Sequence, residues 1–265
     1  MSQKGSGAEN IFSEYAAYYD ILYQDKDYAG EALFISQLID KLLSKNRRNI
    51  QLLDLACGTG RHAMELSKLG YQVEGSDVSE KMIRIAKEES NKNNFGITFY
   101  NESFQTAGRL GKKYDVVLSL FSAICYITSY NDLSIAFRNI SSLLNAEGIF
   151  IFDFWNGNAV LDSFSPIRIK RMAKDGKEIL RISETTLDKI TQTANLKFKF
   201  ILIQNNSISK EFQEEHRVRY FFLQEMVDFL HANRFEVIFR CPFMNHLKDI
   251  DVADWNTAYV VRKLK

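Results

Sequence analysis

The sequence predicts an α/β fold in which a doubly wound parallel sheet carries an inserted antiparallel sheet. Two observations support this prediction. Over residues 50–154, short apolar runs alternate with segments of helical periodicity, which is typical of a parallel sheet covered by helices on both faces. Over residues 167–222 the pattern changes to stretches in which apolar and polar residues alternate, as in antiparallel strands with one buried face.

The expected elements follow these two patterns along the chain. Two helices in the first 45 residues precede the first strand. We then expect strands at 50–55, 71–76, 97–100, 114–120 and 149–154. The helices between them are expected at 60–69, from Ser79 onwards and at 132–145, and Ser79 is expected to cap its helix. A helix at 224–232 and strands at 235–240 and 256–263 complete the chain.

The inserted region contains three clearly alternating stretches, at 177–183, 194–204 and 212–222. In the second stretch, Phe198 and Phe200 share one face, whereas the intervening lysines take the other. In the third, His216 shares a face with Val218, and Arg217 lies on the opposite face. We therefore expect a sheet with one apolar face and one charged face.

Composition narrows the class of protein. The 265 residues fit one large domain, or one domain with a sizeable insertion. A formal net charge of +1 provides no global field for polyanions, so we expect no nucleic-acid partner. Because no apolar run is long enough to span a bilayer and the N-terminus is polar, we expect a cytoplasmic location and no membrane partner. The three cysteines form no CxxC pair, so no disulfide framework and no metal site are expected.

A strand, a glycine turn and a helix start follow one another at 50–66. The apolar strand 50–55 leads into Gly58 and Gly60, and a segment of helical spacing begins at Arg61. Such a turn lets backbone N–H groups approach a ligand closely. Asp77, at the end of the next strand, is placed to accept hydrogen bonds from both hydroxyls of a ribose. The sequence therefore predicts a nucleoside site.

Two kinds of nucleoside cofactor fit this turn. Gly58, Gly60 and Ala63 satisfy the loose dinucleotide fingerprint, so an NAD-dependent oxidoreductase is an alternative. Asp54, on the strand four residues before Gly58, favours another ligand. A carboxylate there would repel a pyrophosphate, whereas it can orient a loop or a water that meets an ammonium group.

Four segments in order resemble the motifs of the class I S-adenosylmethionine (SAM)-dependent methyltransferases. They are 54–60 (DLACGTG), 73–79 (VEGSDVS) with Met82, 114–118 (YDVVL) and 148–153 (GIFIFD). The resemblance implies a Rossmann-like, seven-stranded sheet whose last strand runs antiparallel to the rest. It also implies that the cofactor is SAM.

The resemblance and the positions along the expected strands together assign the cofactor-binding residues. Ala56, Gly58 and Gly60 present their backbone to the methionine part and the sulfonium, near Asp54, and Asp77 holds the ribose. The remaining assignments are Val78 and Met82 at the adenine ring, Glu102 and Ser103 at the adenine amino group, and Leu120 and Phe121 near the methyl group.

The N-terminal segment 15–28 resembles the opening of bacterial methyltransferases that N-methylate nucleotide-linked amino sugars. In that group an N-terminal helix closes over SAM, and the resemblance implies cofactor contacts for Tyr19 and Tyr28. One difference weakens the inference that the substrate is an amino sugar. Where the amino-sugar enzymes carry a Gly-His pair, this chain has Cys125-Tyr126. An O-methyltransferase acting on a sugar or another hydroxylated metabolite therefore stays open.

Candidate residues for the chemistry come from several segments. Tyr126 is placed to orient an acceptor, and His216 to act as a base if its face of the inserted sheet covers the pocket. Arg217 or Arg219 would bind a phosphate or carboxylate of the substrate. Trp155 and Asn156, just past the fifth strand, lie at the carboxyl edge where open α/β sheets bind ligands.

These observations lead to one organisation and three functional hypotheses. We expect a helical cap at 1–45, a SAM-binding unit at 46–156 and 223–265, and an inserted sheet over the active site at 157–222. The leading hypothesis is a methyltransferase that moves a methyl group to N or O of a small polar metabolite. An NAD-dependent oxidoreductase and a SAM-binding protein without turnover are the alternatives, and a homodimer is compatible with each.

Overall fold

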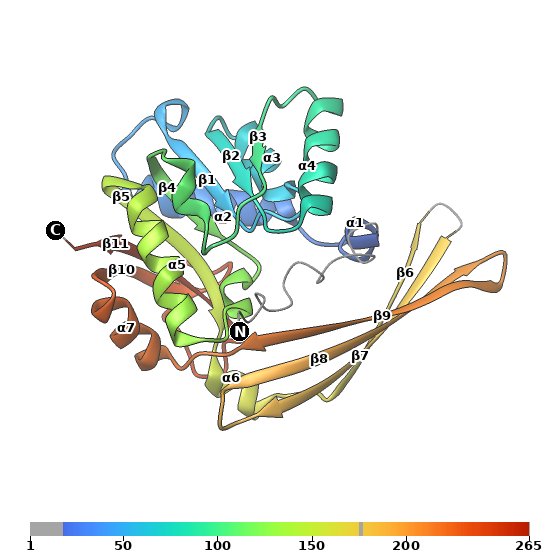
Figure 1. Cartoon of the computed structure of the whole chain (residues 1–265). Coiled ribbons are helices and arrows are strands. Elements are labelled where there is room, and N and C mark those ends of the chain that lie inside the picture. Colours follow the sequence, from blue (N-terminus) through green and yellow to red (C-terminus); the bar gives the residue numbers. More distant parts are fainter. Residues whose placement is uncertain (1–17, 175–176, 265) are drawn as a thin grey trace, which may run out of the picture.

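The computed structural model describes residues 18–174 and 177–264, and it is built on two separate sheets (Figure 1). The larger sheet has seven strands in the order β10-β11-β5-β4-β1-β2-β3. Its strands are β1 (Gln51–Leu55), β2 (Gln72–Ser76), β3 (Thr98–Tyr100), β4 (Tyr114–Ser119), β5 (Leu144–Trp155), β10 (Phe235–Pro242) and β11 (Asn256–Lys263). β11 is antiparallel to both of its neighbours, β10 and β5, and the other strand pairs of this sheet are parallel, which confirms the predicted topology.

Helices cover both faces of this sheet, as the alternation in the sequence predicted. They are α2 (Tyr28–Leu42), α3 (Arg61–Lys68), α4 (Glu80–Lys92), α5 (Tyr130–Leu143) and α7 (Leu223–Ala232). Successive strand residues enter opposite cores: Leu52 packs with α2, α3 and α4, whereas Leu53 packs with α5 and α7. The strands are therefore buried on both sides, which explains their nearly continuous apolar sequences.

Capping serines set the starts of two helices. The Ser79 hydroxyl accepts a hydrogen bond from the Met82 N–H, as predicted, and α4 buries Met82 against the sheet. α5 begins two residues earlier than predicted because Ser129 caps it, accepting from the Asp132 N–H. The shorter elements are α1 (Tyr19–Leu22), α6 (Gly157–Asp162) and three 3₁₀ turns, η3 (Arg47–Asn49), η4 (Ala107–Leu110) and η5 (Ala123–Tyr126).

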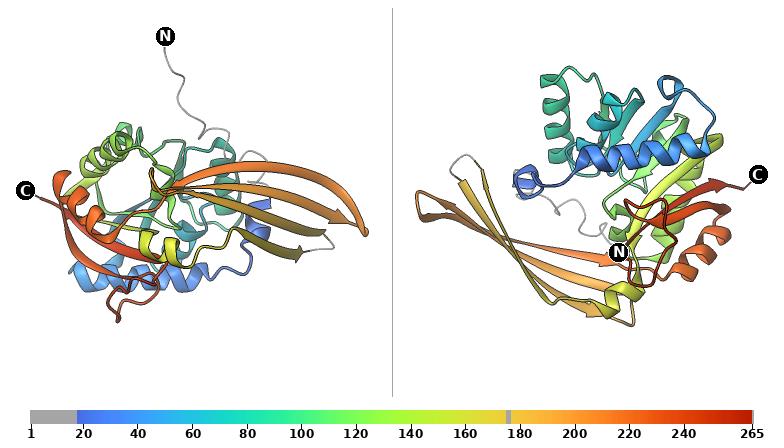
Figure 2. Two further views of the ribbon diagram at one scale, coloured as in Figure 1. Left: turned by 90° about the horizontal axis from the view of Figure 1, so that it is seen from below. Right: turned by 180° about the vertical axis from the view of Figure 1, so that it is seen from behind.

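The second sheet is an antiparallel meander of β6 (Ile167–Lys174), β7 (Lys177–Asp188), β8 (Thr193–Gln204) and β9 (Ser207–Arg219). It reaches away from the α/β body as a long twisted ribbon (Figure 2). The predicted faces of β8 are confirmed, since Phe198 and Phe200 are buried and Lys197 is exposed. α1 packs on this sheet, with Leu22 buried beside both phenylalanines.

The predicted N-terminal cap, 1–45, is described only in part. Residues 1–17, with Tyr15 among them, lie outside the described residues. α2 shares the core of the larger sheet, so α1 is the described part that lies apart from that core.

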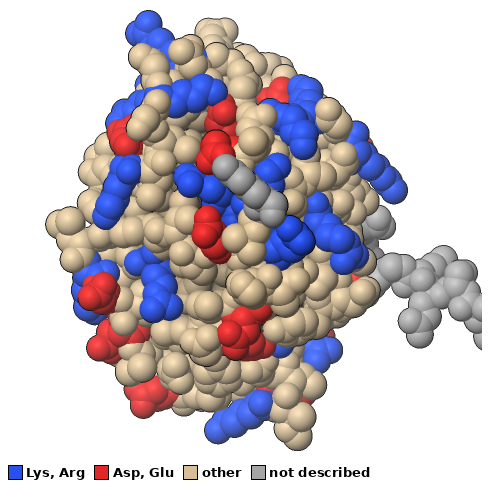
Figure 3. All heavy atoms as spheres, turned by 90° about the vertical axis from the view of Figure 1, so that its left-hand side faces the viewer, with Lys and Arg blue, Asp and Glu red and all other residues tan. Residues whose placement is uncertain are grey.

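Within the described ranges no helix has the length and apolarity needed to cross a membrane. The three cysteines are free and buried. On the face in Figure 3, basic and acidic side chains are both scattered among uncharged ones.

Candidate functional site

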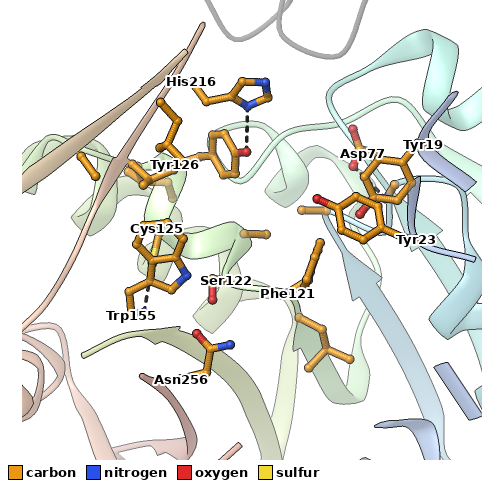
Figure 4. A pocket seen from close by; sticks show the side chains of 18 of the residues that line it. Tyr19, Tyr23, Asp77, Phe121, Ser122, Cys125, Tyr126, Trp155, His216 and Asn256 are labelled. Atoms are coloured by element: carbon orange, nitrogen blue, oxygen red, sulfur yellow. Dashed lines mark hydrogen bonds between the residues drawn. The ribbon is translucent and has the colours of Figure 1, made fainter. Parts of the chain in front are cut away.

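A cavity of about 690 Å³ lies between the carboxyl ends of the parallel strands and the inner face of the second sheet. Its volume is in the usual range for small-molecule sites. The order of strands reverses between β1 and β4, and open α/β sheets bind their ligands at this reversal. Most of the residues that we expected at the site line this one cavity, among them Tyr19, Asp77, Phe121, Tyr126 and Trp155 (Figure 4).

The glycine turn forms one end of the cavity. Ala56 and Gly58 both have positive φ, at 66° and 56°, and the Cys57 N–H donates to the Ser76 carbonyl at the end of β2 (2.9 Å). A Cβ atom added at Gly58 would meet nothing within 4 Å, so the backbone there is open to the cavity. The turn thus exposes peptide groups where a ligand can reach them.

Asp77 lies against this turn, as predicted. Its Oδ2 accepts from the Gly58 N–H (2.9 Å) and its Oδ1 from the Ser79 N–H (2.8 Å). Burial raises the pKa of the Asp77 carboxyl, and the two backbone hydrogen bonds oppose this rise. Each oxygen retains acceptor capacity, so the carboxylate can bind hydroxyls without giving up its backbone partners.

Asp54 is the second buried carboxylate at this end of the cavity. Burial raises its pKa to about 6, against an opposing effect of His62. Its Oδ2 has no hydrogen-bond partner among the residues that the structure describes. A buried oxygen of this kind favours a donor from a ligand or a bound water.

A paired histidine that the sequence analysis did not assign to the site lines the same wall. His62 Nε2 lies 2.7 Å from Glu31 Oε2, and Lys26 forms a second ion pair with Glu31. Burial acts to raise the pKa of Glu31, but the hydrogen bonds from His62 and Lys26 outweigh it and lower the pKa. The Tyr28 ring packs edge-on against His62, 4.9 Å away. No local pattern in the sequence marks this pair, since 31 positions separate its members.

α1 closes over the glycine turn. The Thr59 hydroxyl donates to Asp20 Oδ1 (2.8 Å), and the rings of Tyr19 and Tyr23 pack 4.8 Å apart at the edge of the cavity. Tyr23 also contacts Phe121 edge-on at 5.1 Å. α1 therefore brings two aromatic rings to the place where the sequence predicted one.

The remaining predicted cofactor residues line the cavity beyond Asp77. They are Val78, Met82, Glu102, Ser103 and Leu120. Phe121 and Ser122 are two successive non-glycine residues with positive φ, at 62° and 56°. Asp153 holds this turn, because its Oδ2 accepts from both the N–H (2.9 Å) and the hydroxyl (2.8 Å) of Ser122. Burial raises the pKa of Asp153 to about 6. Asp153 is the last residue of the motif 148–153, but nothing in that motif indicates the contact with Ser122.

Tyr126 and His216 meet across the cavity, although the sequence analysis proposed them separately. The Tyr126 hydroxyl and His216 Nδ1 are 2.9 Å apart and hydrogen bonded (Figure 4). Tyr126 comes from η5 beside β4, and His216 comes from β9 of the second sheet. Burial raises the pKa of the Tyr126 phenol, so the ring stays neutral over the ordinary pH range.

The outer end of the cavity combines indole rings and arginines. Trp155 packs edge-on against Trp255, with ring centroids 5.5 Å apart. Arg168, exposed on β6, lies over Trp255 at 5.3 Å. Arg181 of β7 also lines the cavity, but it lies nearer α1, where it donates to the Tyr23 hydroxyl (3.1 Å). Neither arginine was predicted at the site, although the alternating pattern within 167–183 could have indicated them.

Two residues that were expected at the site, one for the cofactor and one for the substrate, do not line the cavity. Gly60 does not line the cavity; it packs on β3, where an added Cβ would come within 2.9 Å of the Phe99 ring. Asn156 does not line it either, because its side chain caps α6 and donates to the carbonyls of Val252 and Asp254, each at 3.1 Å. Both residues therefore shape the fold around the site.

The two arginines expected to bind the substrate are also corrected. Arg217 and Arg219 lie on the face of β9 opposite His216, and neither lines the cavity. Arg219 is buried and forms an ion pair with Glu225 of α7 at 2.6 Å. The Arg217 guanidinium lies 3.4 Å from the Thr193 hydroxyl on β8. The alternation of the strand was predicted correctly, but which face meets the cavity depends on packing.

Comparisons with known proteins agree with this geometry. Residues 52–148 match the family described as "Methyltransferase domain". The chain is 29% identical to the dTDP-3-amino-3,4,6-trideoxy-alpha-D-glucopyranose N,N-dimethyltransferase of Streptomyces venezuelae, over 65% of this chain and 70% of that protein. It is 23% identical to the dTDP-3-amino-3,6-dideoxy-alpha-D-glucopyranose N,N-dimethyltransferase of Streptomyces fradiae, over 78% of each. A crystal structure of a SAM-dependent methyltransferase from Clostridium acetobutylicum superposes with a TM-score of 0.80 at 19% identity, covering 96% of this chain and 99% of that one.

The residues at the inner end of the cavity fit SAM. Asp54 offers an unpartnered carboxylate oxygen, Gly58 an open backbone, and Asp77 a carboxylate with spare acceptor capacity. Two buried carboxylates favour a ligand that carries positive charge. None of the matched proteins above is an oxidoreductase, so the NAD alternative gains no support. From its fold, its matched domain and this cofactor cavity, the chain is a SAM-dependent methyltransferase of the class I fold.

Proposed function

We propose that this enzyme transfers a methyl group from SAM to an amine or hydroxyl of a nucleotide-linked sugar. The observation that carries the proposal is the hydrogen bond of 2.9 Å between Tyr126 and His216 above the cavity. Both side chains are polar. One comes from the 3₁₀ turn η5 and the other from β9 of the second sheet, and they meet where an acceptor would approach the cofactor. The relative from Streptomyces venezuelae, named as a dTDP-amino-sugar N,N-dimethyltransferase, supports the substrate class.

The inner end of the cavity is assigned to the cofactor. Asp77 would hold the ribose, and the peptide groups of Ala56 and Gly58, with Asp54 behind them, would hold the amino-acid part. The other residues assigned to cofactor contact are Tyr19, Tyr28, Val78, Met82, Glu102, Ser103, Leu120 and Phe121. When bound, SAM supplies an electrophilic methyl group on a sulfonium, whose S–C bond breaks with the electron pair staying on sulfur.

The protein's own task is to position the acceptor and receive its proton. Holding two reactants at near-attack distance contributes up to roughly 7–11 kcal/mol to lowering a barrier. Tyr126, neutral because burial raises its pKa, would orient the acceptor atom by a hydrogen bond. His216, hydrogen bonded to Tyr126, offers an imidazole nitrogen that can accept the proton. A base serves both an ammonium acceptor and a hydroxyl acceptor.

The outer end of the cavity is assigned to the nucleotide part. Arg168 lines it, and a guanidinium suits a diphosphate because it donates in a planar fork. Trp155 and Trp255 supply aromatic surface beside Arg168. We expect these residues to contact the diphosphate and the base, leaving the sugar near Tyr126.

A methyl-transfer assay tests the proposal. The protein is incubated with SAM carrying a labelled methyl group and a panel of dTDP-linked sugars, some with an amine and some with hydroxyls only. Mass spectrometry should find one labelled methyl group on a dTDP-linked sugar and none on the free sugars. Absence of SAM binding by calorimetry, or of transfer to any member of the panel, would contradict the proposal.

A second measurement separates chemistry from binding. We expect Tyr126→Phe to lower turnover while SAM affinity stays unchanged, because the hydroxyl faces the acceptor and His216. Equal losses of turnover and SAM affinity would indicate a structural role for Tyr126 and remove the assigned one.

A further inference from the structure

We propose that Glu214 is a positioning residue of this site, which orients His216 so that its Nδ1 accepts the proton of Tyr126. The inference rests on the proposed function and adds to it the route of the acceptor's proton. It assigns a role to a carboxylate that does not itself line the cavity.

The three groups form a chain across the wall of the cavity. Glu214 and His216 are two residues apart on β9, so both side chains lie on its inner face. Glu214 Oε2 lies 3.4 Å from His216 Nε2, within ion-pair range but longer than a charge-assisted hydrogen bond, whereas His216 Nδ1 is hydrogen bonded to the Tyr126 hydroxyl at 2.9 Å. The imidazole is therefore held between a carboxylate and a phenol.

The burial of Glu214 calls for an explanation. Glu214 is 8% exposed and His216 is 2% exposed, whereas the neighbouring Glu215 is exposed on the outer face. Glu214 occupies a position where the alternation of the strand favours an apolar residue, facing Phe198 on β8. Burying a carboxylate is costly unless a partner compensates. The contact with His216 contributes to that compensation and places the carboxylate beside the imidazole.

The contacts of the two ring nitrogens favour one tautomer of His216. A carboxylate beside Nε2 favours an N–H there, which leaves Nδ1 as an acceptor. Tyr126 then donates to Nδ1, and a lone pair of its oxygen faces the cavity. The same logic operates where an aspartate orients the histidine of a serine hydrolase.

The proton can then move in one concerted direction. As the acceptor's N–C or O–C bond forms to the methyl carbon, the acceptor's proton passes to the Tyr126 oxygen. The hydroxyl proton of Tyr126 passes to His216 Nδ1, so Tyr126 ends neutral and His216 ends as an imidazolium. Glu214 stabilises that positive charge.

Other charged and titratable groups face the same place. Arg181, from β7, lies over the Phe198 ring at 5.2 Å and favours the ionised form of Tyr126, whereas Glu214 disfavours it. Tyr23 and Cys125 also act on Tyr126 and disfavour its ionised form. The described surroundings thus combine one positive group with one negative group, and the negative one is beside the imidazole.

Activity measurements test the role with a matched control. The assay uses dTDP-3-amino-3,4,6-trideoxy-α-D-glucopyranose as acceptor, and compares Glu214→Gln with Glu215→Gln, which removes the exposed neighbour near Lys197. We expect E214Q to lower kcat by about 10–100-fold, with unchanged KM for both substrates. The acid limb of its kcat–pH profile should move to lower pH, because the imidazolium loses a negative neighbour. E215Q should match the wild type.

A spectroscopic measurement needs neither substrate nor cofactor. The four histidines are labelled with ¹⁵N, and His216→Asn identifies the signal of His216. The wild type should show His216 with hydrogen on Nε2, and Glu214→Leu should shift it toward hydrogen on Nδ1. Wild-type hydrogen on Nδ1 would overturn the inference.

The two proposals fail in different ways. Wild-type turnover together with an unchanged kcat and pH profile in E214Q overturns the role of Glu214 and leaves methyl transfer standing. If the wild type transfers no methyl group, the proposed function is wrong. The tautomer of His216 then still shows whether Glu214 orients the ring.

Discussion

Asp54 and Asp77 are neighbouring carboxylates whose surroundings give them different roles. Both oxygens of Asp77 already accept from backbone N–H groups, whereas Asp54 retains an unpartnered oxygen. The first is held rigidly for a ligand that brings hydroxyls. The second is available to a donor or a water, and it adds a buried negative charge that suits a cationic cofactor.

The first prediction at the residue scale concerns Asp77. Replacing Asp77 with Ala should weaken SAM binding by about 1–3 kcal/mol, because charge-assisted hydrogen bonds to the ribose are lost. Calorimetry measures the change. Glu80→Ala, which removes an exposed carboxylate from the first turn of α4, serves as the control and should leave the affinity unchanged. An unchanged affinity in Asp77→Ala would place the ribose elsewhere.

The second prediction concerns Arg168 at the outer end of the cavity. Arg168→Gln should raise KM for a dTDP-linked sugar about two- to tenfold while kcat stays constant, because an exposed guanidinium contributes modestly to binding. The effect should shrink at high salt. Lys189→Gln, which removes an exposed charge from the β7–β8 turn, should change nothing. A fall in kcat alone would argue against a binding role.

The sequence predicted single residues of the site better than pairs. Asp77 and the glycine turn were found because their spacing follows the order of strands in a doubly wound sheet. The contact between Tyr126 and His216 spans 90 positions, and its distance depends on how the second sheet packs over the first. Arg219 was misassigned for the same reason: the period of a strand gives two faces but does not say which one meets the cavity.

At the scale of elements, α1 connects the two halves of the molecule. Its Asp20 accepts from Thr59 of the glycine turn, and Tyr23 accepts from Arg181 of the second sheet (3.1 Å). Just after it, Asp25 forms an ion pair with Lys170 of β6 (2.9 Å). The segment around α1 therefore contacts the α/β body and the second sheet together. Its position over the cavity is suited to covering a bound cofactor.

The third prediction tests this cover. Asp20→Ala should speed the dissociation of SAM about two- to tenfold, because one hydrogen bond that holds α1 on the glycine turn is lost. Stopped-flow displacement measures the rate. Asp40→Ala, which removes a carboxylate paired with Arg47 on the surface of α2, is the control. Equal dissociation rates in the two variants would show that α1 does not retain the cofactor.

The strands of the second sheet are longer than the sequence indicated. Predicted stretches stopped at 204 and resumed at 212, but β9 already begins at Ser207. Asn205 and Asn206 both have positive φ (50° and 58°), which a tight two-residue hairpin requires and asparagine tolerates. The Asn-Asn pair was therefore a turn signal. The polar residues after it concealed the strand, since both faces of β9 are exposed there.

At the scale of the whole molecule, buried carboxylates set how stability responds to pH. The pKa values of Asp54 and Asp153 are raised to about 6 in the folded protein. As pH rises from about 4, the unfolded chain releases these protons first. Each group therefore favours folding below that range, and this contribution is lost as pH rises toward 6.

The fourth prediction isolates one of these groups. The free energy of unfolding of the wild type, relative to Asp153→Asn, should fall by about 2–3 kcal/mol between pH 4 and pH 7. Urea unfolding of the SAM-free protein at both pH values measures this difference. A difference that stays constant with pH would show that Asp153 ionises alike in the folded and unfolded chains.

The inserted segment leaves the α/β body and rejoins it at adjacent positions. The Gly157 N–H donates to the Phe221 carbonyl (2.9 Å), and the Phe221 N–H donates to the Trp155 carbonyl (3.0 Å). The segment therefore begins next to Trp155 and ends at Phe221, and these two residues are joined by a backbone hydrogen bond. Because both attachment points are adjacent, we expect that the segment can be exchanged between related enzymes. Such an exchange should change the preferred acceptor and leave the cofactor-binding residues in place.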